Sequence, residues 1–238
     1  MDTPLTWAEV DLDAYAHNIR ELRRITDPKA RLMAVVKANG YGHGALEVAG
    51  TARQNGADWL GVARLHEAVE LREAGLEAPI LIFGYSPPDS VQFLIKYDLA
   101  QSVYTRRTAE AYSEQAARAG KPIKVHIKVD SGMGRLGILQ DDLAAGSMTS
   151  DSAGNAFSEV EAISRMSYLK IEGIFTHFAT SDSADKSYAN RHLERFLDFL
   201  AQLDHAGVRL AARGRAGLRP DPVAGAGEPA PNLFFYGC

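Results

Sequence analysis

The chain has 238 residues, of which 46% are hydrophobic and 24% charged, and its formal net charge is −4. This composition is typical of a globular protein that is long enough to bury a large core. The small negative charge and the absence of a basic stripe exclude nucleic acid and anionic membranes as expected partners.

Three further features of the sequence bear on location. No apolar run approaches the roughly 18 residues that cross a bilayer. The first ten residues, MDTPLTWAEV, lack the basic and apolar regions of a signal peptide. The single cysteine, Cys238, is the last residue and has no partner for an intrachain disulfide. We therefore expect a cytoplasmic protein.

Short apolar runs alternate with segments of helical periodicity along most of the chain. Continuous apolar runs are typical of strands that are buried on both faces of a parallel sheet. In chain order, the candidate strands are residues 31–36, 58–63, 79–83, 99–104, 121–130 and 169–176.

Two helices between these runs are clear. One is predicted over residues 64–74, where Gly75 provides a natural stop, and a longer one over residues 188–205. The longer helix has an apolar stripe that follows the 3.6-residue period, with charged residues opposite. The stripe comprises Leu193, Phe196, Leu197, Leu200 and Leu203.

Strand–helix units in series predict an α/β fold, a (β/α)8 TIM-type barrel. A doubly wound open sheet is the alternative, because no feature of the sequence proves closure. We assign residues 1–210 to the barrel domain. Residues 211–238 are rich in Ala, Gly and Pro, which oppose both helix and strand, so we expect a disordered tail. Residues 140–155 are small and polar and predict a surface loop.

Lys37 follows the first predicted strand, at the end where barrels of this type carry their functional residues. The next residues, 38–44, read ANGYGHG, and their three glycines let the backbone approach a ligand closely. A lysine at the end of an apolar strand is partly removed from water, which favours a neutral, nucleophilic amine. The plain alternative is a lysine that only reaches solvent from the strand end.

The fifth predicted strand places ionisable side chains on one face. Alternation puts His126, Lys128 and Asp130 on the face opposite to Val125 and Ile127. In a barrel the apolar face meets the helices and the ionisable face points inward. An inward lysine is costly unless it is paired or neutralised. A Lys128–Asp130 ion pair is one solution.

Four segments resemble the alanine racemase family in order and spacing. They are residues 8–14 (AEVDLDA), 34–44 (AVVKANGYGHG), 126–137 (HIKVDSGMGRLG) and 173–182 (GIFTHFATSD). The likeness extends over residues 7–210. It implies a barrel that binds pyridoxal 5′-phosphate (PLP), and a homodimeric isomerase that interconverts L-alanine and D-alanine for peptidoglycan.

The resemblance also implies roles for five residues. Lys37 would bind PLP covalently and act as one of two catalytic bases. Tyr41 would contribute to the phosphate side of the cofactor, Arg135 would hydrogen-bond its phenolic oxygen, and His177 would lie flat against its ring. In some members the lysine that matches Lys128 is carbamylated and holds the arginine, an alternative to the ion pair with Asp130.

Other residues are expected to have no role in chemistry. His66, His192 and His205 are interpreted as helix-surface residues. No Cys/His spacing indicates a metal site.

The likeness stops near Leu210. Gly214 and Arg215 stand where the family has an Asn-Ser pair for the phosphate, and residues 233–237 only faintly resemble a later phosphate segment. The tyrosine that serves the family as second base, in a separate β domain, is missing. We therefore expect a truncated chain with a barrel that is incomplete after about its seventh strand, and weak or absent racemase activity. The alternative function is a single-barrel PLP-binding protein without racemase activity, and serine or another small amino acid stays open as substrate.

Overall fold

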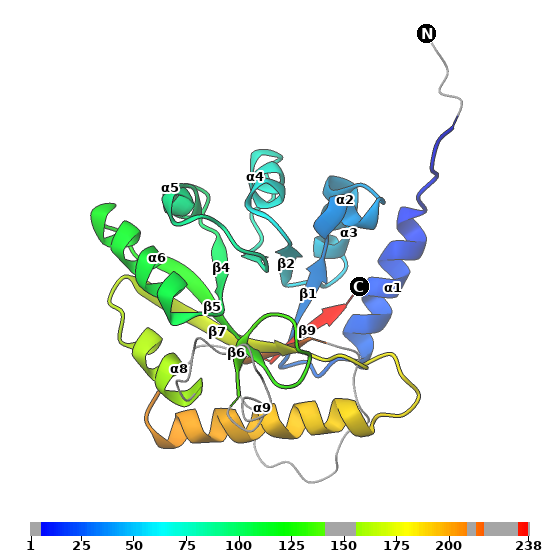
Figure 1. Ribbon diagram of the computed structural model, residues 1–238. Helices are drawn as coiled ribbons and strands as arrows, with labels where there is room; N and C mark the ends of the chain where they lie inside the picture. The colour runs from blue at the N-terminus through cyan, green and yellow to red at the C-terminus, as the bar shows by residue number, and fades with distance from the viewer. Residues whose placement is uncertain (1–5, 141–155, 209–212, 217–232, 238) are drawn as a thin grey trace.

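The computed structural model describes residues 6–140, 156–208, 213–216 and 233–237. Its elements form two concentric layers, with strands inside and helices outside (Figure 1). The strands are β1 (Arg31–Val35), β2 (Trp59–Val62), β3 (Ile80–Ile82), β4 (Ala100–Val103), β5 (Ile123–Asp130), β6 (Ile138–Leu139), β7 (Leu169–His177), β8 (Arg213–Ala216) and β9 (Leu233–Gly237).

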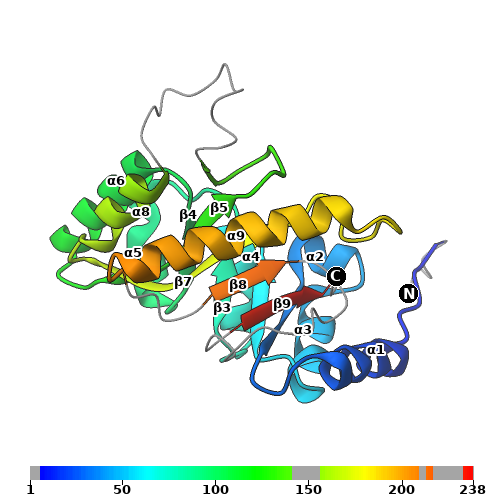
Figure 2. The ribbon, with the colours of Figure 1, turned by 90° about the horizontal axis from the view of Figure 1, so that it is seen from below.

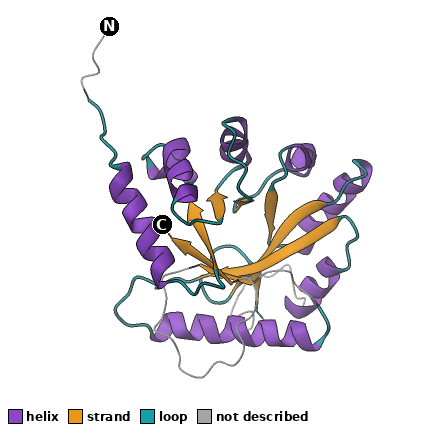
Figure 3. Ribbon diagram, turned by 180° about the vertical axis from the view of Figure 1, so that it is seen from behind, coloured by secondary structure: helices purple, strands orange, loops and turns teal. Residues whose placement is uncertain are grey.

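The helices surround this sheet on its outer side (Figure 3). The first of them begins after Asp11, whose side chain accepts a hydrogen bond from the Ala14 backbone N–H at 2.9 Å. The helices are α1 (Leu12–Ile25), α2 (Lys37–Tyr41), α3 (Ala45–Gln54), α4 (Leu65–Glu73), the 3-10 helix η1 (Pro88–Ser90), α5 (Val91–Lys96), α6 (Arg106–Arg118), α8 (Ala156–Ser164) and α9 (Ser187–His205).

The strands close into a ring through parallel pairings. The order runs β1–β2–β3–β4–β5–β7–β8–β9 and returns from β9 to β1. The predicted α/β barrel is therefore confirmed, and the open doubly wound sheet is excluded. All six strands predicted from apolar runs are present, with ends that differ from the prediction by at most two residues.

Two strands lie in the segment that was predicted to be a disordered tail. Residues 213–216 and 233–237 form β8 and β9, which lie side by side and complete the ring (Figure 2). For these segments the expectation does not hold, because β7 and β1 offer backbone donors and acceptors that a strand of any composition can pair with. The rest of 211–238, and all but the first residue of the predicted loop 140–155, lie outside the described residues.

The outer layer ends earlier than the ring of strands. In the described part of the chain, the last helix is α9, which precedes β8, and no helix follows β8 or β9. The ring of strands closes, so the predicted incompleteness after the seventh strand concerns the outer layer of helices in the described residues. None of the described helices combines the length and the apolar character that crossing a lipid bilayer requires.

The core has two parts because successive side chains of a strand point to opposite sides of the barrel wall. In β1, Leu32 and Ala34 pack outward against the helices, whereas Met33 points inward. Burial of a large apolar side chain stabilises a fold by roughly 1.5–3 kcal/mol, so both parts contribute. The inner cluster comprises Met33, Trp59, Leu81, Ala100 and Phe175.

Helix α9 confirms the predicted long helix and corrects its stripe. Leu197 was predicted in the apolar face but is 48% exposed, and Phe199 is buried instead. Leu197 stands at the edge of the stripe, where the packing of neighbouring elements decides burial. His192 also faces inward.

Candidate active site

Lys37 stands at the carboxyl end of β1, in a turn with a left-handed backbone. The φ angles of Ala38, Asn39, Gly40 and Tyr41 are 52°, 54°, 60° and 55°. A left-handed conformation costs an L-residue roughly 1–2 kcal/mol. Four consecutive residues adopt this conformation, and three of them are not glycine. They therefore mark a strained segment, of the kind that clusters at functional sites.

Local hydrogen bonds hold the far side of this turn. The Gly42 N–H donates to the Ala38 carbonyl at 3.1 Å, and the Gly44 N–H donates to the Asn39 carbonyl at 3.0 Å. The Asn39 side-chain oxygen accepts from the Ala45 N–H at 2.8 Å and so connects the turn to α3. Residues 37–44 are called the lysine turn below.

The structure places Lys37 and Tyr41 close together. The Nζ atom of Lys37 lies 5.7 Å from the centroid of the Tyr41 ring. Lys37 is half-buried and Tyr41 is 46% exposed, so the pair stands at the opening of the barrel.

Strand β5 presents its ionisable face to the interior, as the alternation predicted. Val125 and Ile127 belong to the outer cluster. His126 packs edge-on against the ring of Trp59, with centroids 5.3 Å apart, and the Nζ atom of Lys128 lies 5.9 Å from the Phe175 centroid. Burial lowers the pKa of His126 to about 3, which leaves this imidazole neutral.

Lys128 is buried among positive charges. Its pKa is lowered to about 8, mainly by burial and then by the charges of Arg135 and Lys37, against the opposing charge of Asp130. Asp130 is not an ion-pair partner of Lys128 in the described residues, so the simple pair suggested by the sequence is wrong. The reason is that the Asp130 carboxylate is engaged elsewhere: it accepts from the backbone N–H groups of Gly132 at 2.8 Å and Arg135 at 3.0 Å.

Residues 131–137, called the arginine loop below, are also held by α9. The Tyr188 hydroxyl donates to the Gly132 carbonyl at 2.9 Å. The His192 ring packs on Tyr188, with centroids 4.4 Å apart, and lies so close to Gly132 that a Cβ there would be 2.4 Å from its Nε2 atom. Asp130 at the end of β5 and the sequence-distant helix α9 thus both hold the loop that carries Arg135.

His192 was predicted on the helix surface, and this prediction is wrong, because the residue is 0% exposed. Its spacing of four, seven and eleven residues from Phe196, Phe199 and Leu203 is the helical signal that could have identified it. Burial lowers its pKa. His66 and His205 are exposed, as predicted. Sequence reasoning also missed Tyr188.

His177 ends β7 and completes the group. Burial lowers its pKa to about 4, and the nearby positive charges of Arg135, Lys128 and Lys37 act in the same direction. Because β1, β5 and β7 run parallel in one ring, the four predicted side chains, which lie at or near the carboxyl ends of these strands, share one end of the barrel. His177 is therefore neutral at pH 7, beside side chains that are mainly cationic.

This donor set fits a ligand with an aldehyde and negatively charged oxygens. Asp130 accepts two backbone hydrogen bonds, and neither Lys37 nor Arg135 forms a salt bridge with a carboxylate of the described residues. An amine can bond to an aldehyde, a guanidinium suits an anionic oxygen, and a neutral imidazole can stack on an aromatic ring. PLP meets all three requirements. Within the described ranges, no group of His, Cys, Asp and Glu side chains could hold a metal ion.

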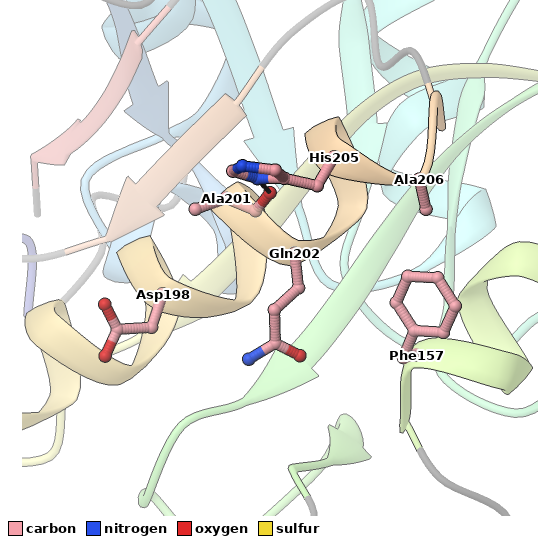
Figure 4. A pocket seen from close by; sticks show the side chains of 6 residues that line it. All are labelled: Phe157, Asp198, Ala201, Gln202, His205 and Ala206. Atoms are coloured by element: carbon pink, nitrogen blue, oxygen red, sulfur yellow. Dashed lines mark hydrogen bonds between the residues drawn. The ribbon is translucent and has the colours of Figure 1, made fainter.

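A surface pocket on the outer helical layer is separate from this cluster (Figure 4). It lies between α8 and α9, and His205 uses its Nδ1 atom to contact the Ala201 carbonyl of its own helix at 2.8 Å. Lys37, Lys128, Arg135 and His177 do not line this pocket. The pocket is lined by Phe157, Asp198, Ala201, Gln202, His205 and Ala206.

The chain belongs to the family described as alanine racemase, N-terminal domain, whose sequence profile matches residues 10–217. It is 45% identical over 210 residues to an alanine racemase of Desulfosudis oleivorans, and the match covers 88% of this chain and 53% of that protein. It is 39% identical over 234 residues to an alanine racemase of Methanococcus maripaludis, covering 97% of this chain and 60% of the relative.

Solved structures agree with this assignment. An alanine racemase of Clostridium difficile 630 matches with a TM-score of 0.84 and 32% identity, over 100% of this chain and 62% of that chain. An alanine racemase of Bacillus anthracis with bound L-Ala-P matches with a TM-score of 0.81 and 32% identity, over 99% and 58%. The chain therefore spans between half and two thirds of the length of these relatives.

Proposed function

We propose that this chain binds PLP covalently through Lys37 and forms the cofactor-carrying part of a racemase that interconverts L-alanine and D-alanine. The observation that carries the proposal is the position of Lys37 on a strained turn at the barrel opening, close to Arg135, Lys128 and His177. Membership of the alanine racemase N-terminal domain family supports both the cofactor and the substrate.

Each side chain has a distinct part in this proposal. The Lys37 amine would hold the cofactor by condensing with its aldehyde, with loss of one water, and Tyr41, next to it, would contribute to the phosphate side. Arg135 would donate to the phenolic oxygen through its planar guanidinium, whose fixed fork of N–H groups suits an anionic oxygen. His177, kept neutral by burial and by its cationic neighbours, stacks on the ring without adding positive charge.

The chemistry then needs a proton to leave one face of a carbon atom and return on the other. PLP, when bound, withdraws electrons from the α-carbon of an attached amino acid and weakens its C–H bond. We propose that the Nζ atom of Lys37 moves the proton on one face. The group that serves the opposite face is expected outside the residues that the structure describes.

Lys128 has a supporting part. Its low pKa, about 8, increases the neutral fraction of its amine, and only a neutral amine reacts with carbon dioxide. We propose that Lys128 is carbamylated, because the resulting anion would offset the charge of the adjacent Arg135. Mass spectra of gently handled, unreduced protein would show the added carboxyl group on Lys128.

The test is covalent trapping. The chain is incubated with PLP, reduced with borohydride and digested, and mass spectrometry locates the pyridoxyl group. We expect it on Lys37 and expect it to be lost in Lys37→Ala, which removes the amine. Lys29→Ala, at an exposed lysine remote from the barrel opening, is the matched control and should label as the unchanged chain does.

Two outcomes would contradict the proposal at different levels. Folded protein without label at Lys37 would overturn cofactor binding. Label at Lys37 without D-alanine formation from L-alanine, when the chain is assayed alone and with the remaining part of a related racemase, would favour a PLP-binding protein without racemase activity.

A further inference from the structure

Glu67 joins the ends of two neighbouring strands through its carboxylate. Its Oε2 atom accepts hydrogen bonds from the backbone N–H groups of Ala63 at 2.7 Å and Arg64 at 2.9 Å, at the start of α4. Its Oε1 atom accepts from the Ala38 N–H at 2.6 Å. One side chain therefore connects the exit of β2 with the residue that follows Lys37.

Helix capping explains only half of this arrangement. A glutamate at the third position of a helix commonly accepts from the backbone before the helix, and the Oε2 contacts do this. The Oε1 contact leaves the helix and reaches the lysine turn, 29 residues earlier in the sequence. It satisfies the first N–H group of the left-handed segment, which the local hydrogen bonds of the turn leave without an acceptor.

The peptide between Lys37 and Ala38 determines the direction in which the lysine side chain leaves β1. Ala38 has a φ of 52°, which its own Cβ disfavours, and the residue is exposed. Hydrogen bonds to an ionised carboxylate are shorter and stronger than those between neutral groups. Glu67 therefore supplies a strong tether where the backbone is strained.

We propose that Glu67 is a positioning residue for Lys37: its carboxylate holds the Lys37–Ala38 peptide so that the Nζ atom meets the aldehyde of the cofactor. This inference rests on the proposed function of Lys37. In it, Glu67 acts through the backbone and does not touch the cofactor.

The experiment compares three measurements on the full chain. Glu67→Ala removes both tethers, whereas Glu67→Gln keeps the size of the side chain but has one acceptor oxygen instead of two. We measure amide hydrogen exchange at Ala38 without PLP, the affinity for PLP together with the yield of pyridoxyl label at Lys37, and the free energy of unfolding. We expect faster exchange at Ala38 and roughly tenfold weaker PLP binding for Glu67→Ala, with Glu67→Gln between this variant and the unchanged chain.

Two control variants separate positioning from stability. Glu70→Ala removes an exposed carboxylate from the same helix and should leave all three measurements unchanged. Leu71→Val weakens the packing of α4 at a buried position without touching the turn. This variant should lower the free energy of unfolding. Its PLP affinity should equal that of the unchanged chain, and so should its amide exchange at Ala38, measured under conditions where unfolding is rare.

The proposal is overturned if Glu67→Ala leaves Ala38 exchange and PLP affinity unchanged. It is also overturned if Leu71→Val, at the same free energy of unfolding as Glu67→Ala, weakens PLP binding as much as Glu67→Ala does. If the unchanged chain takes no PLP at Lys37, the proposed function fails by itself. Exchange at Ala38 in the unloaded protein then still decides whether Glu67 holds the turn.

Discussion

The lysine turn and the arginine loop lie at the same end of the barrel. In each of them, backbone N–H groups donate to a side-chain carboxylate, but the two carboxylates come from different places in the sequence. Asp130, directly before the arginine loop, accepts from the N–H groups of Gly132 and Arg135. Glu67, which accepts from Ala38, belongs to the next strand–helix unit. In both cases a carboxylate accepts hydrogen bonds from the backbone of a loop that carries a basic side chain of the proposed site, and the two carboxylates differ in their distance from that loop along the chain.

The two loops also differ in what surrounds their glycines. A Cβ on Gly137 would lie 2.5 Å from the backbone nitrogen of Asp130, which cannot move without disturbing β5. A Cβ on Gly40 would lie 2.7 Å from a methyl group of Val48, a side chain that can shift with α3. The arginine loop is therefore the more tightly enclosed of the two, and three experiments test this comparison.

The largest expected effect is that of Gly137→Ala. The methyl group meets fixed backbone and the φ of 148° is unfavourable for alanine, so we expect a loss of about 3 kcal/mol in the free energy of unfolding. Gly40→Ala should cost less, about 1–2 kcal/mol. Urea denaturation of the two variants measures both values.

Gly134→Ala is the control for these substitutions. Gly134 has a φ of 71° but nothing within 4 Å of an added Cβ, so only the backbone cost of about 1 kcal/mol remains. If Gly40→Ala proved more costly than Gly137→Ala, the arginine loop would not be the more enclosed one.

A smaller effect is expected from a change of pH, through His177, whose pKa is influenced by Arg135 in one loop and Lys37 in the other. The pKa of His177 is lowered from 6.5 to about 4, first by burial and then by Arg135, Lys128 and Lys37. The folded chain thus binds this proton less readily than the unfolded chain. The free energy of unfolding should fall as pH falls from 6.5 towards 4. Above pH 6.5, His177 should add nothing to the pH dependence of this free energy.

His177→Asn should make this pH dependence shallower, as measured by urea unfolding at pH 7, 6 and 5. His205→Asn, at an exposed histidine, should leave it unchanged. An equal slope for His177→Asn and the unchanged chain would show that the pKa of His177 is not lowered in the folded chain.

The smallest effect is expected from Tyr188→Phe, which removes one hydrogen bond to the arginine loop. We expect a loss of about 1 kcal/mol and faster amide exchange in residues 131–137, with the lysine turn unaffected. Tyr168→Phe, at a more exposed ring, is the control. Faster exchange in both loops would mean that they are held as one unit.

Much of the fold follows from local patterns. Apolar runs predicted six strands of the ring, and the alternation in β5 correctly placed Lys128 inside the barrel. Family resemblance selected Lys37, Arg135 and His177, which the structure brings to one end. Two of the ring strands, β8 and β9, were missed, because β8 (RGRA) has no strand pattern of its own and the short apolar run of β9 (LFFYG) stands in a segment rich in Ala, Gly and Pro.

The sequence by itself determined where most strands and helices lie and which reactive side chains follow the strands, since periodicity and short motifs are properties of neighbouring residues. Only the tertiary structure decided that Asp130 binds backbone instead of Lys128, that His192 is buried and that Glu67 reaches Ala38. These contacts depend on which strands become neighbours and on distances of a few ångströms between atoms far apart along the chain, and no local pattern records either.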